Sequence, residues 1–121
     1  MLLTKFFDAI SKFVPGDPFM GGDPYEIAKL DPDKIYVENV RAAMRTSERQ
    51  ARLYCETAVR QGIFDRYVEA ILPDDVVAVS APTERELPLT VQRWVERDGK
   101  MEEETFETAT LSRRAFYRLH R

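Results

Sequence analysis

The chain has few of the residues that most often carry chemistry: its 121 residues include one cysteine, Cys55, and one histidine, His120. A single cysteine excludes a disulfide within the chain and any zinc site built from cysteines, and it is consistent with a reducing cytosol. Cys55 lies on the apolar stripe of a predicted helix, so we expect a small buried residue rather than a nucleophile. A catalytic pairing of Cys55 with His120 is not expected.

Signals for membranes, secretion and common catalytic motifs are also missing. No run approaches the roughly eighteen apolar residues of a membrane span. The N-terminus lacks a charged segment before a long apolar core and a cleavage site, so we expect a cytoplasmic protein. There is no glycine-rich phosphate loop and no nucleophile elbow, and the acidic clusters Asp74-Asp75 and Glu102–Glu104 are typical of solvated surface. We therefore expect no enzyme, no cofactor and no metal site.

Only one block of the sequence has a net positive charge. The net charge is −3, and hydrophobic residues at 44% with charged residues at 32% are typical of a globular domain. Residues 41–70 carry six arginines against four acids, whereas the segments before and after them are each net negative. Because affinity for nucleic acid comes mostly from Lys and Arg, the overall balance does not indicate a strong nucleic-acid binder.

An amphipathic helix is predicted over residues 1–14, where apolar side chains recur at spacings of three and four. The side chains expected to bind a partner are Leu3, Phe6, Phe7, Ile10 and Phe13. Residues 15–32 hold four of the seven prolines and three of the five glycines, so they form a predicted linker. The favoured expectation is that the helix packs on its own domain, and the second alternative is that it docks on a partner. Its polar face is thin for binding a membrane surface.

Two helices joined by a tight turn are predicted after this linker. The segment Asp31-Pro32-Asp33 favours a helix start, with Asp31 as the cap and Pro32 at the first helical position, so we expect the first helix to reach about Arg45. Ser47 and Gln50 form a capping box for the second helix, and Gly62 suits the left-handed residue that closes it. A core stripe follows along the second helix: Ala51, Tyr54, Cys55, Ala58 and Val59.

A β-hairpin is predicted directly after the second helix. Residues 65–72 and 76–81 are rich in Val, Ile, Tyr and Ala and flank the turn Pro73-Asp74-Asp75. In order and residue types, residues 34–81 resemble the winged-helix domains of bacterial regulators and accessory proteins. This resemblance covers about two fifths of the chain and implies a helix-turn-helix followed by a β wing.

The rest of the chain is predicted as a small sheet appended to the wing. Strands at 89–97 and 101–108 flank Asp98-Gly99, a strong signal for a two-residue hairpin turn. Residues 115–119 are predicted as a third strand of this sheet. The expected fold class is therefore α+β, with residues 33–121 as a single winged-helix domain carrying a C-terminal β extension.

Residues 34–119 also resemble winged-helix modules followed by a ribbon-like β unit. In many such modules, paired cysteines in the turns hold zinc, but both turns of this chain lack cysteine. The resemblance then implies that apolar packing has replaced the metal. The residues expected to supply that packing are Trp94, Phe106 and Tyr117.

The exposed face of the helix over 47–61 is the candidate surface for nucleic acid or a partner. With the residue just before the helix, it comprises Arg45, Arg49, Arg52, Glu56 and Arg60. Arginine can contact guanine edges or phosphates, but Glu56 at the centre would repel phosphate and can pair with Arg60. Asp74 and Asp75 occupy the wing, where DNA readers often carry basic residues.

These patterns predict a non-catalytic adaptor or assembly subunit that binds another protein, or a second copy of itself, in a bacterial-type cytosolic complex. The alternative is a DNA-binding transcriptional regulator that uses the helix over 47–61. A small enzyme is a third and weaker alternative, because the sequence pairs no nucleophile with a base.

Overall fold

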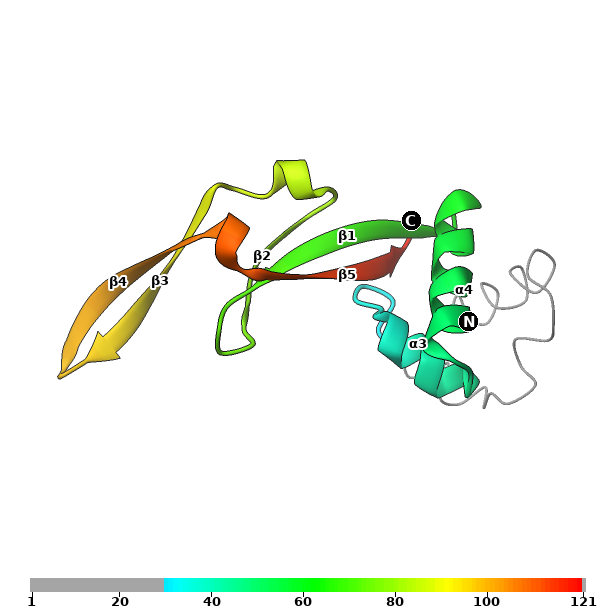
Figure 1. Ribbon diagram of the computed structural model, residues 1–121, viewed down its shortest axis with the longest axis horizontal. Helices are drawn as coiled ribbons and strands as arrows, with labels where there is room; N and C mark the ends of the chain where they lie inside the picture. Colours follow the sequence, from blue (N-terminus) through cyan, green and yellow to red (C-terminus); the bar gives the residue numbers. More distant parts are fainter. Residues whose placement is uncertain (1–29, 121) are drawn as a thin grey trace. The chain divides into compact units, whose positions relative to one another are not determined.

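The computed structural model describes residues 30–120, which form a mixed α+β structure (Figure 1). Residues 1–29 and Arg121 lie outside the described part. The predicted helix over 1–14, and nearly all of the predicted linker over 15–32, therefore fall outside the described residues. The elements in chain order are α3 (Val37–Met44), α4 (Glu48–Arg60), β1 (Phe64–Ile71), β2 (Val77–Ala81), η1 (Glu84–Glu86), β3 (Thr90–Arg97), β4 (Lys100–Glu107), η2 (Thr108–Thr110) and β5 (Ser112–Leu119).

The described residues divide into two compact units. Unit 1 comprises the described residues up to Arg66 and those from Phe116 onward, and unit 2 comprises Tyr67–Ala115. Both helices of the described part, α3 and α4, belong to unit 1, and the paired strands β3 and β4 belong to unit 2. Strands β1 and β5 each contribute residues to both units.

Helix α3 begins at Val37, so the predicted start at Pro32 after an Asp31 cap is wrong. Asp31 closes a local turn instead, because its Oδ1 accepts a hydrogen bond from the backbone N–H of Asp33 at 2.9 Å. Ile35 then adopts an extended conformation and forms a β-bridge with Tyr117, with backbone hydrogen bonds of 2.8 and 2.7 Å. A residue in a β-bridge cannot continue a helix, and α3 starts only after it.

Helix α4 follows the local signals of the sequence. Ser47 Oγ accepts a hydrogen bond from the backbone N–H of Gln50 at 3.1 Å, which satisfies one free donor at the helix start. At the other end Gly62 has φ +73°, and the N–H of Ile63 donates to the carbonyl of Ala58 at 2.9 Å. These features form a Schellman ending, as predicted.

The core of unit 1 lies between the two helices and the ends of β1 and β5. Phe64 and Tyr117 are nearly fully buried, with ring centroids 5.9 Å apart. Burying each large apolar side chain contributes roughly 1.5–3 kcal/mol. Other members of the cluster are Ile35, Val37, Val40, Ala43, Met44, Ala51, Tyr54, Cys55, Ala58 and Leu119.

Strand β5 does not belong to the β3–β4 sheet, so the predicted three-stranded extension is wrong. The structure has a three-stranded sheet in the order β2-β1-β5 and a separate two-stranded sheet of β3 and β4. The C-terminal half of β5 is apolar, and Phe116, Tyr117 and Leu119 are buried. Burial of these residues determines the partner of β5, and no local pattern encodes that pairing.

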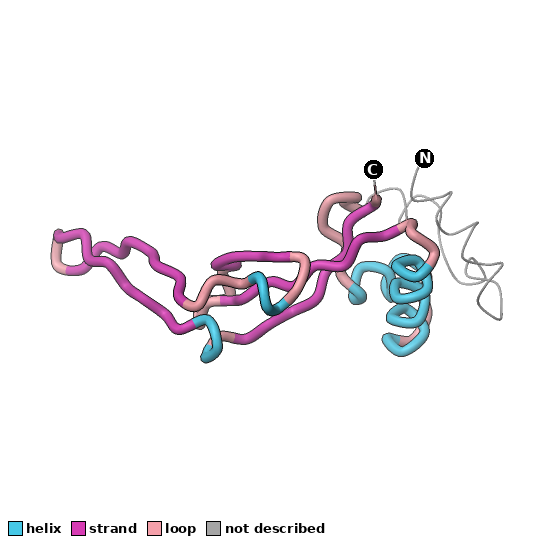
Figure 2. The backbone as a smooth tube through the Cα atoms, turned by 90° about the horizontal axis from the view of Figure 1, so that it is seen from above, coloured by secondary structure: helices cyan, strands magenta, loops and turns pink. Residues whose placement is uncertain are grey.

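Strands β3 and β4 form an antiparallel ribbon in unbroken register from Thr90 opposite Glu107 to Arg97 opposite Lys100 (Figure 2). The two-residue turn Asp98-Gly99 closes it, with φ values of +51° and +75°. Both residues lie in the left-handed region, as this type of hairpin turn requires. The predicted turn is confirmed.

The predicted cluster of Trp94, Phe106 and Tyr117 does not form. Phe106 packs with Ala70, Leu72 and Leu111 in unit 2, whereas Tyr117 lies in the core of unit 1. Trp94 is 64% exposed. It lies on the face of the ribbon opposite Val91 and Phe106, because neighbouring positions of a strand alternate between faces.

Candidate interaction surfaces

The residues predicted to dock on a partner through the N-terminal helix lie outside the described residues. These residues are Leu3, Phe6, Phe7, Ile10 and Phe13. One candidate surface belongs to unit 1 and the other belongs to unit 2.

The first surface is the exposed face of α4, called the α4 face and defined by Arg49, Arg52, Leu53, Glu56 and Arg60. Arg49, Arg52 and Arg60 are exposed, as predicted, and Arg45 is exposed just before the helix. Leu53 is 41% exposed and stands among these cations. A shallow groove runs along this face, lined by Ser47, Arg49, Gln50, Arg52, Leu53 and Glu56.

Glu56 is a structural acceptor rather than a free charge on the α4 face. The hydroxyl of buried Tyr117 donates a hydrogen bond of 2.6 Å to Glu56 Oε1, and Arg66 lies 3.6 Å from the same oxygen. The predicted pair of Glu56 with Arg60 is absent, because Arg60 donates to Thr57 Oγ1 at 3.0 Å. Burial, together with the hydrogen bond to Glu56, raises the pKa of Tyr117 well above its usual value. The Tyr117 hydroxyl therefore stays protonated and continues to donate.

The α4 face is consequently more basic than the sequence implied. Arg52 is paired with Glu48 at 3.0 Å, which leaves Arg45, Arg49 and Arg60 without an acidic partner among residues 30–120. The described residues of unit 1 carry eight basic and six acidic side chains, hence a net charge of +2 with His120 neutral. The surface suits an acidic or phosphate-bearing partner.

Cys55 and His120 do not form a catalytic pair. Cys55 is fully buried, and burial followed by the charge of Glu56 raises its pKa from 9.0 to about 12. His120 contacts Asp65 instead, with Nδ1 3.0 Å from the carboxylate. Among residues 30–120, no group of three His, Cys, Asp or Glu side chains is arranged to hold a metal ion. A protonated, enclosed thiol has little reactivity.

The second surface belongs to the β3–β4 ribbon, whose two faces differ. On the inner face, Val91 and Phe106 pack against the apolar cluster of unit 2. Arg93 on this face lies 2.6 Å from Asp74 and 3.1 Å from Glu104. The hydrogen bond from Arg93 lowers the pKa of Asp74. Arg97 pairs with Glu104 and lies 3.6 Å from Glu102, so the charges of the inner face are largely compensated.

The outer ribbon face, defined by Trp94, Glu96, Met101 and Glu103, is uncompensated. Trp94 lies opposite Glu103, and Glu96 lies opposite Met101. Trp94 is 64% exposed and Met101 is 61% exposed. In the described part of the chain, neither Glu96 nor Glu103 has an ion-pair partner. This face therefore combines two large exposed apolar side chains with two unneutralised carboxylates.

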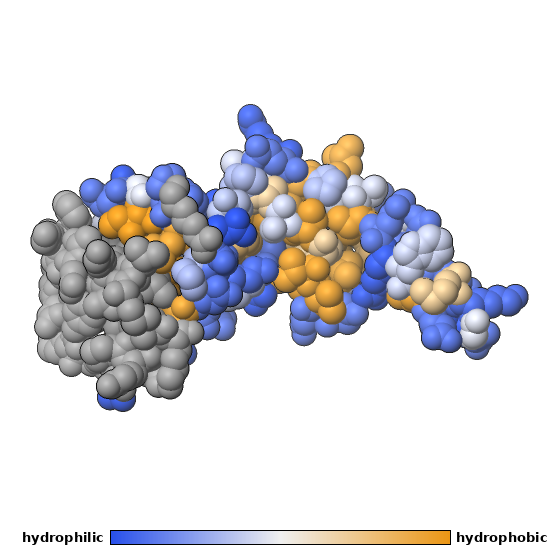
Figure 3. Space-filling model, turned by 180° about the vertical axis from the view of Figure 1, so that it is seen from behind, coloured by the Kyte–Doolittle hydropathy of each residue, from blue (hydrophilic) through white to orange (hydrophobic). Residues whose placement is uncertain are grey.

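The sequence contained a signal for this face. Val91, Arg93, Val95 and Arg97 occupy alternate positions, so Trp94 falls on the opposite side of the strand from both valines. The expectation that Trp94 packs in place of a lost metal, which came from the resemblance, was at odds with that signal. Apolar side chains are also exposed elsewhere on unit 2, where Figure 3 shows them gathered on one face. Val76 and Leu89 are among the exposed apolar residues of unit 2.

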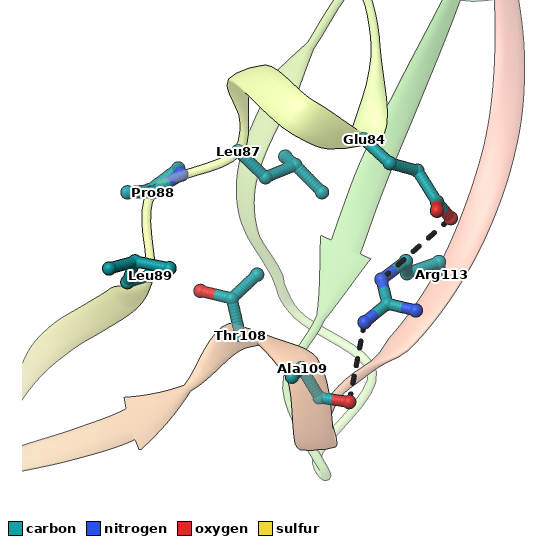
Figure 4. Close-up of a pocket in the computed structure, with 7 residues that line it drawn as sticks. All are labelled: Glu84, Leu87, Pro88, Leu89, Thr108, Ala109 and Arg113. Atoms are coloured by element: carbon teal, nitrogen blue, oxygen red, sulfur yellow. Dashed lines mark hydrogen bonds and ion pairs between the residues drawn. The ribbon is translucent and has the colours of Figure 1, made fainter.

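A small depression in unit 2 is the remaining cavity of interest (Figure 4). Its volume of about 200 Å³ is below the roughly 300–1,000 Å³ of most ligand pockets. The guanidinium of Arg113 lies 3.9 Å from Glu84 and donates to the carbonyl of Ala109 at 3.3 Å. Arg113 thus has partners within the depression, and the hydroxyl of Thr108 at its wall is buried. The depression indicates no particular ligand.

Comparisons with known protein families, curated protein sequences and solved structures found none significantly similar to this chain. Within residues 30–120, neither helix is long and apolar enough to cross a bilayer.

Proposed function

We propose that this protein is a non-catalytic adaptor or assembly subunit that binds other proteins and is built on a winged-helix arrangement. The winged-helix part of the proposal is supported by the order of elements. Helices α3 and α4 are joined by three residues, Arg45–Ser47, and strands follow α4 almost directly. A turn of this length is typical of helix-turn-helix units. Strand β1 lies next to both β2 and β5, and either neighbour can serve as the second strand of the wing.

The exposure of Trp94 and Met101 on the outer ribbon face is the main support for the proposal. Trp and Met are enriched in the cores of protein interfaces, and tryptophan is the residue type most often found to dominate binding energy. A two-stranded hairpin is only marginally stable alone, so its far half, beyond Val91 and Phe106, gains from contact with another surface. The neighbouring carboxylates Glu96 and Glu103 disfavour nucleic acid as that contact.

The charge of unit 2 supports the same conclusion. It carries eleven acidic and six basic side chains, hence a net charge of −5. A unit of this charge repels a phosphate backbone and attracts basic protein surfaces. The charge of unit 2 therefore favours a protein partner over nucleic acid.

The test is affinity purification of the protein at its native level, with and without nuclease. The adaptor proposal expects discrete protein partners in stoichiometric amounts that resist nuclease. Recovery of partners only through nuclease-sensitive nucleic acid would overturn it.

A DNA-binding regulator is the second candidate, and one specific observation favours it. Because Glu56 is held by Tyr117 and Arg66, its charge is partly neutralised, and the α4 face is more basic than its sequence indicates. A regulator predicts salt-dependent binding to duplex DNA that weakens when Arg49 and Arg52 become alanine. Anisotropy titrations at low salt that show no binding would refute this candidate.

A further inference from the structure

We propose that the outer ribbon face binds the α4 face of a second copy of this chain, so that the protein associates with itself head to tail. This inference rests on the proposed function as a protein-binding module and names the partner. The contact is heterologous, because two different surfaces meet, and it builds either a closed ring or an open chain.

Charge complementarity selects the α4 face among possible occupants. Two copies of the outer ribbon face would bring Glu96 and Glu103 against their own equivalents, and like charges across an interface are costly. The α4 face supplies the opposite charge. Arg49 has no acidic partner within the described residues, and Arg52 is exposed and held only by exposed Glu48. Both arginines can therefore turn toward an incoming carboxylate.

Apolar groups are also matched between the two surfaces. Leu53 is 41% exposed between the arginines, where it contacts solvent at a cost that burial would remove. On the ribbon, Trp94 and Met101 are the corresponding exposed apolar groups. Placing Leu53 on Trp94 and Met101 brings Arg49 and Arg52 toward Glu96 and Glu103. An arginine there can also lie over the indole ring.

The two surfaces are of comparable size. Helix α4 has 13 residues and is therefore about 20 Å long and about 10 Å wide. Each ribbon strand has eight residues and is therefore about 27 Å long. Glu96 and Glu103 lie diagonally across the ribbon, about 7–8 Å apart. Arg49 and Arg52 are three residues apart on one helix face, about 5–6 Å between Cβ atoms.

Trp94 is the only tryptophan in the chain, so its fluorescence reports directly on the proposed contact. Raising the concentration of full-length protein should shift the emission to shorter wavelength and reduce quenching by acrylamide. Sedimentation equilibrium on the same samples should show growing mass over the same range. Raising salt to about 0.5 M should reverse both changes, because screening weakens exposed charge pairs.

Charge reversal gives the decisive test. The variants are Glu96→Arg with Glu103→Arg on the ribbon, and Arg49→Glu with Arg52→Glu on α4. Each double variant alone should associate at least about tenfold more weakly, because like charges then face each other. An equimolar mixture of the two should recover wild-type association, because each supplies the complement that the other lacks. Matched controls are Glu86→Arg and Arg41→Glu, exposed charges away from both faces, which should leave association unchanged.

Three outcomes would overturn the inference, given circular dichroism that shows folded variants. The first is a wild type that stays monomeric up to about 1 mM at low salt, where even a weak contact would be detected. The second is association that neither double variant weakens. The third is association that both double variants weaken but that their mixture fails to recover. If the protein is monomeric and still captures another protein, the self-association inference fails while the proposed function stands; if no protein is captured and only DNA binds, the proposed function fails.

Discussion

The hydrogen bond between Tyr117 and Glu56 should measurably stabilise unit 1, and a double-mutant cycle tests it. The Tyr117 hydroxyl lies 2.6 Å from Glu56 Oε1, and Tyr117 is fully buried. Hydrogen bonds to charged groups contribute about 1.5–3 kcal/mol. The Glu56 side chain is 31% exposed, so solvent and Arg66 compensate part of that loss. We therefore predict a coupling free energy of about 1–2 kcal/mol between Tyr117→Phe and Glu56→Ala.

Urea unfolding followed at 222 nm measures this coupling. Helices α3 and α4 both belong to unit 1, so their ellipticity reports that unit, whereas Trp94 fluorescence reports unit 2. Glu48→Ala serves as the control partner for Tyr117→Phe, because Glu48 pairs with Arg52 and should show no coupling to Tyr117. A coupling below about 0.5 kcal/mol, within the error of additive sites, would mean that Glu56 is a free surface charge after all.

Further predictions concern Gly62, Cys55 and the segment of residues 1–17. Gly62→Ala should destabilise the protein by about 1 kcal/mol, because alanine is strained at φ +73°. The cost should be no larger, since no neighbour would clash with the new Cβ. Gly62→Asn should cost less in the same urea titration. Cys55 should resist thiol reagents at pH 8 until the protein unfolds. Because the pKa of the folded Cys55 thiol is raised from 9.0 to about 12, the unfolded chain ionises first, so this contribution to stability is full below about pH 9 and is lost as the pH rises toward 12. Thermal unfolding between pH 8 and pH 11 measures that loss, and a midpoint that rises with pH would contradict it. Deleting residues 1–17 should weaken capture of other proteins through the predicted docking helix and leave the self-association and the circular dichroism of the remaining domain unchanged; an unfolded product would place that segment in the core instead.

Local signals in the sequence predicted the local structure. The cap of Ser47, the left-handed Gly62 and the Asp98-Gly99 turn each involve backbone groups a few residues apart, so short patterns were sufficient. The start of α3 was predicted wrongly because Ile35 is held by a residue more than eighty positions away. The β-bridge of Ile35 overrides the local helix signal, and nothing in the neighbouring sequence reveals that bridge.

The candidate site depended on long-range contacts even more. The arginines of the α4 face were predicted correctly, since a charged stripe on a helix is a periodic feature. The role of Glu56 could not be predicted, because its partner Tyr117 comes from β5 and the pairing of β5 was itself predicted wrongly. Trp94 was expected to pack inside because the resemblance to zinc-bearing modules implied apolar packing in place of the metal, and the alternation of its strand placed it outside.

The most direct test of the central claim is photo-crosslinking in living cells from single positions of the full-length protein. A photoreactive residue replaces Met101 on the outer ribbon face, Arg49 on α4, or Arg85 in η1 as an exposed position away from both. The account predicts discrete protein adducts from position 101, including an adduct of the chain with itself, and few from position 85. Nucleic-acid adducts from position 49, with no protein adduct from position 101, would contradict it.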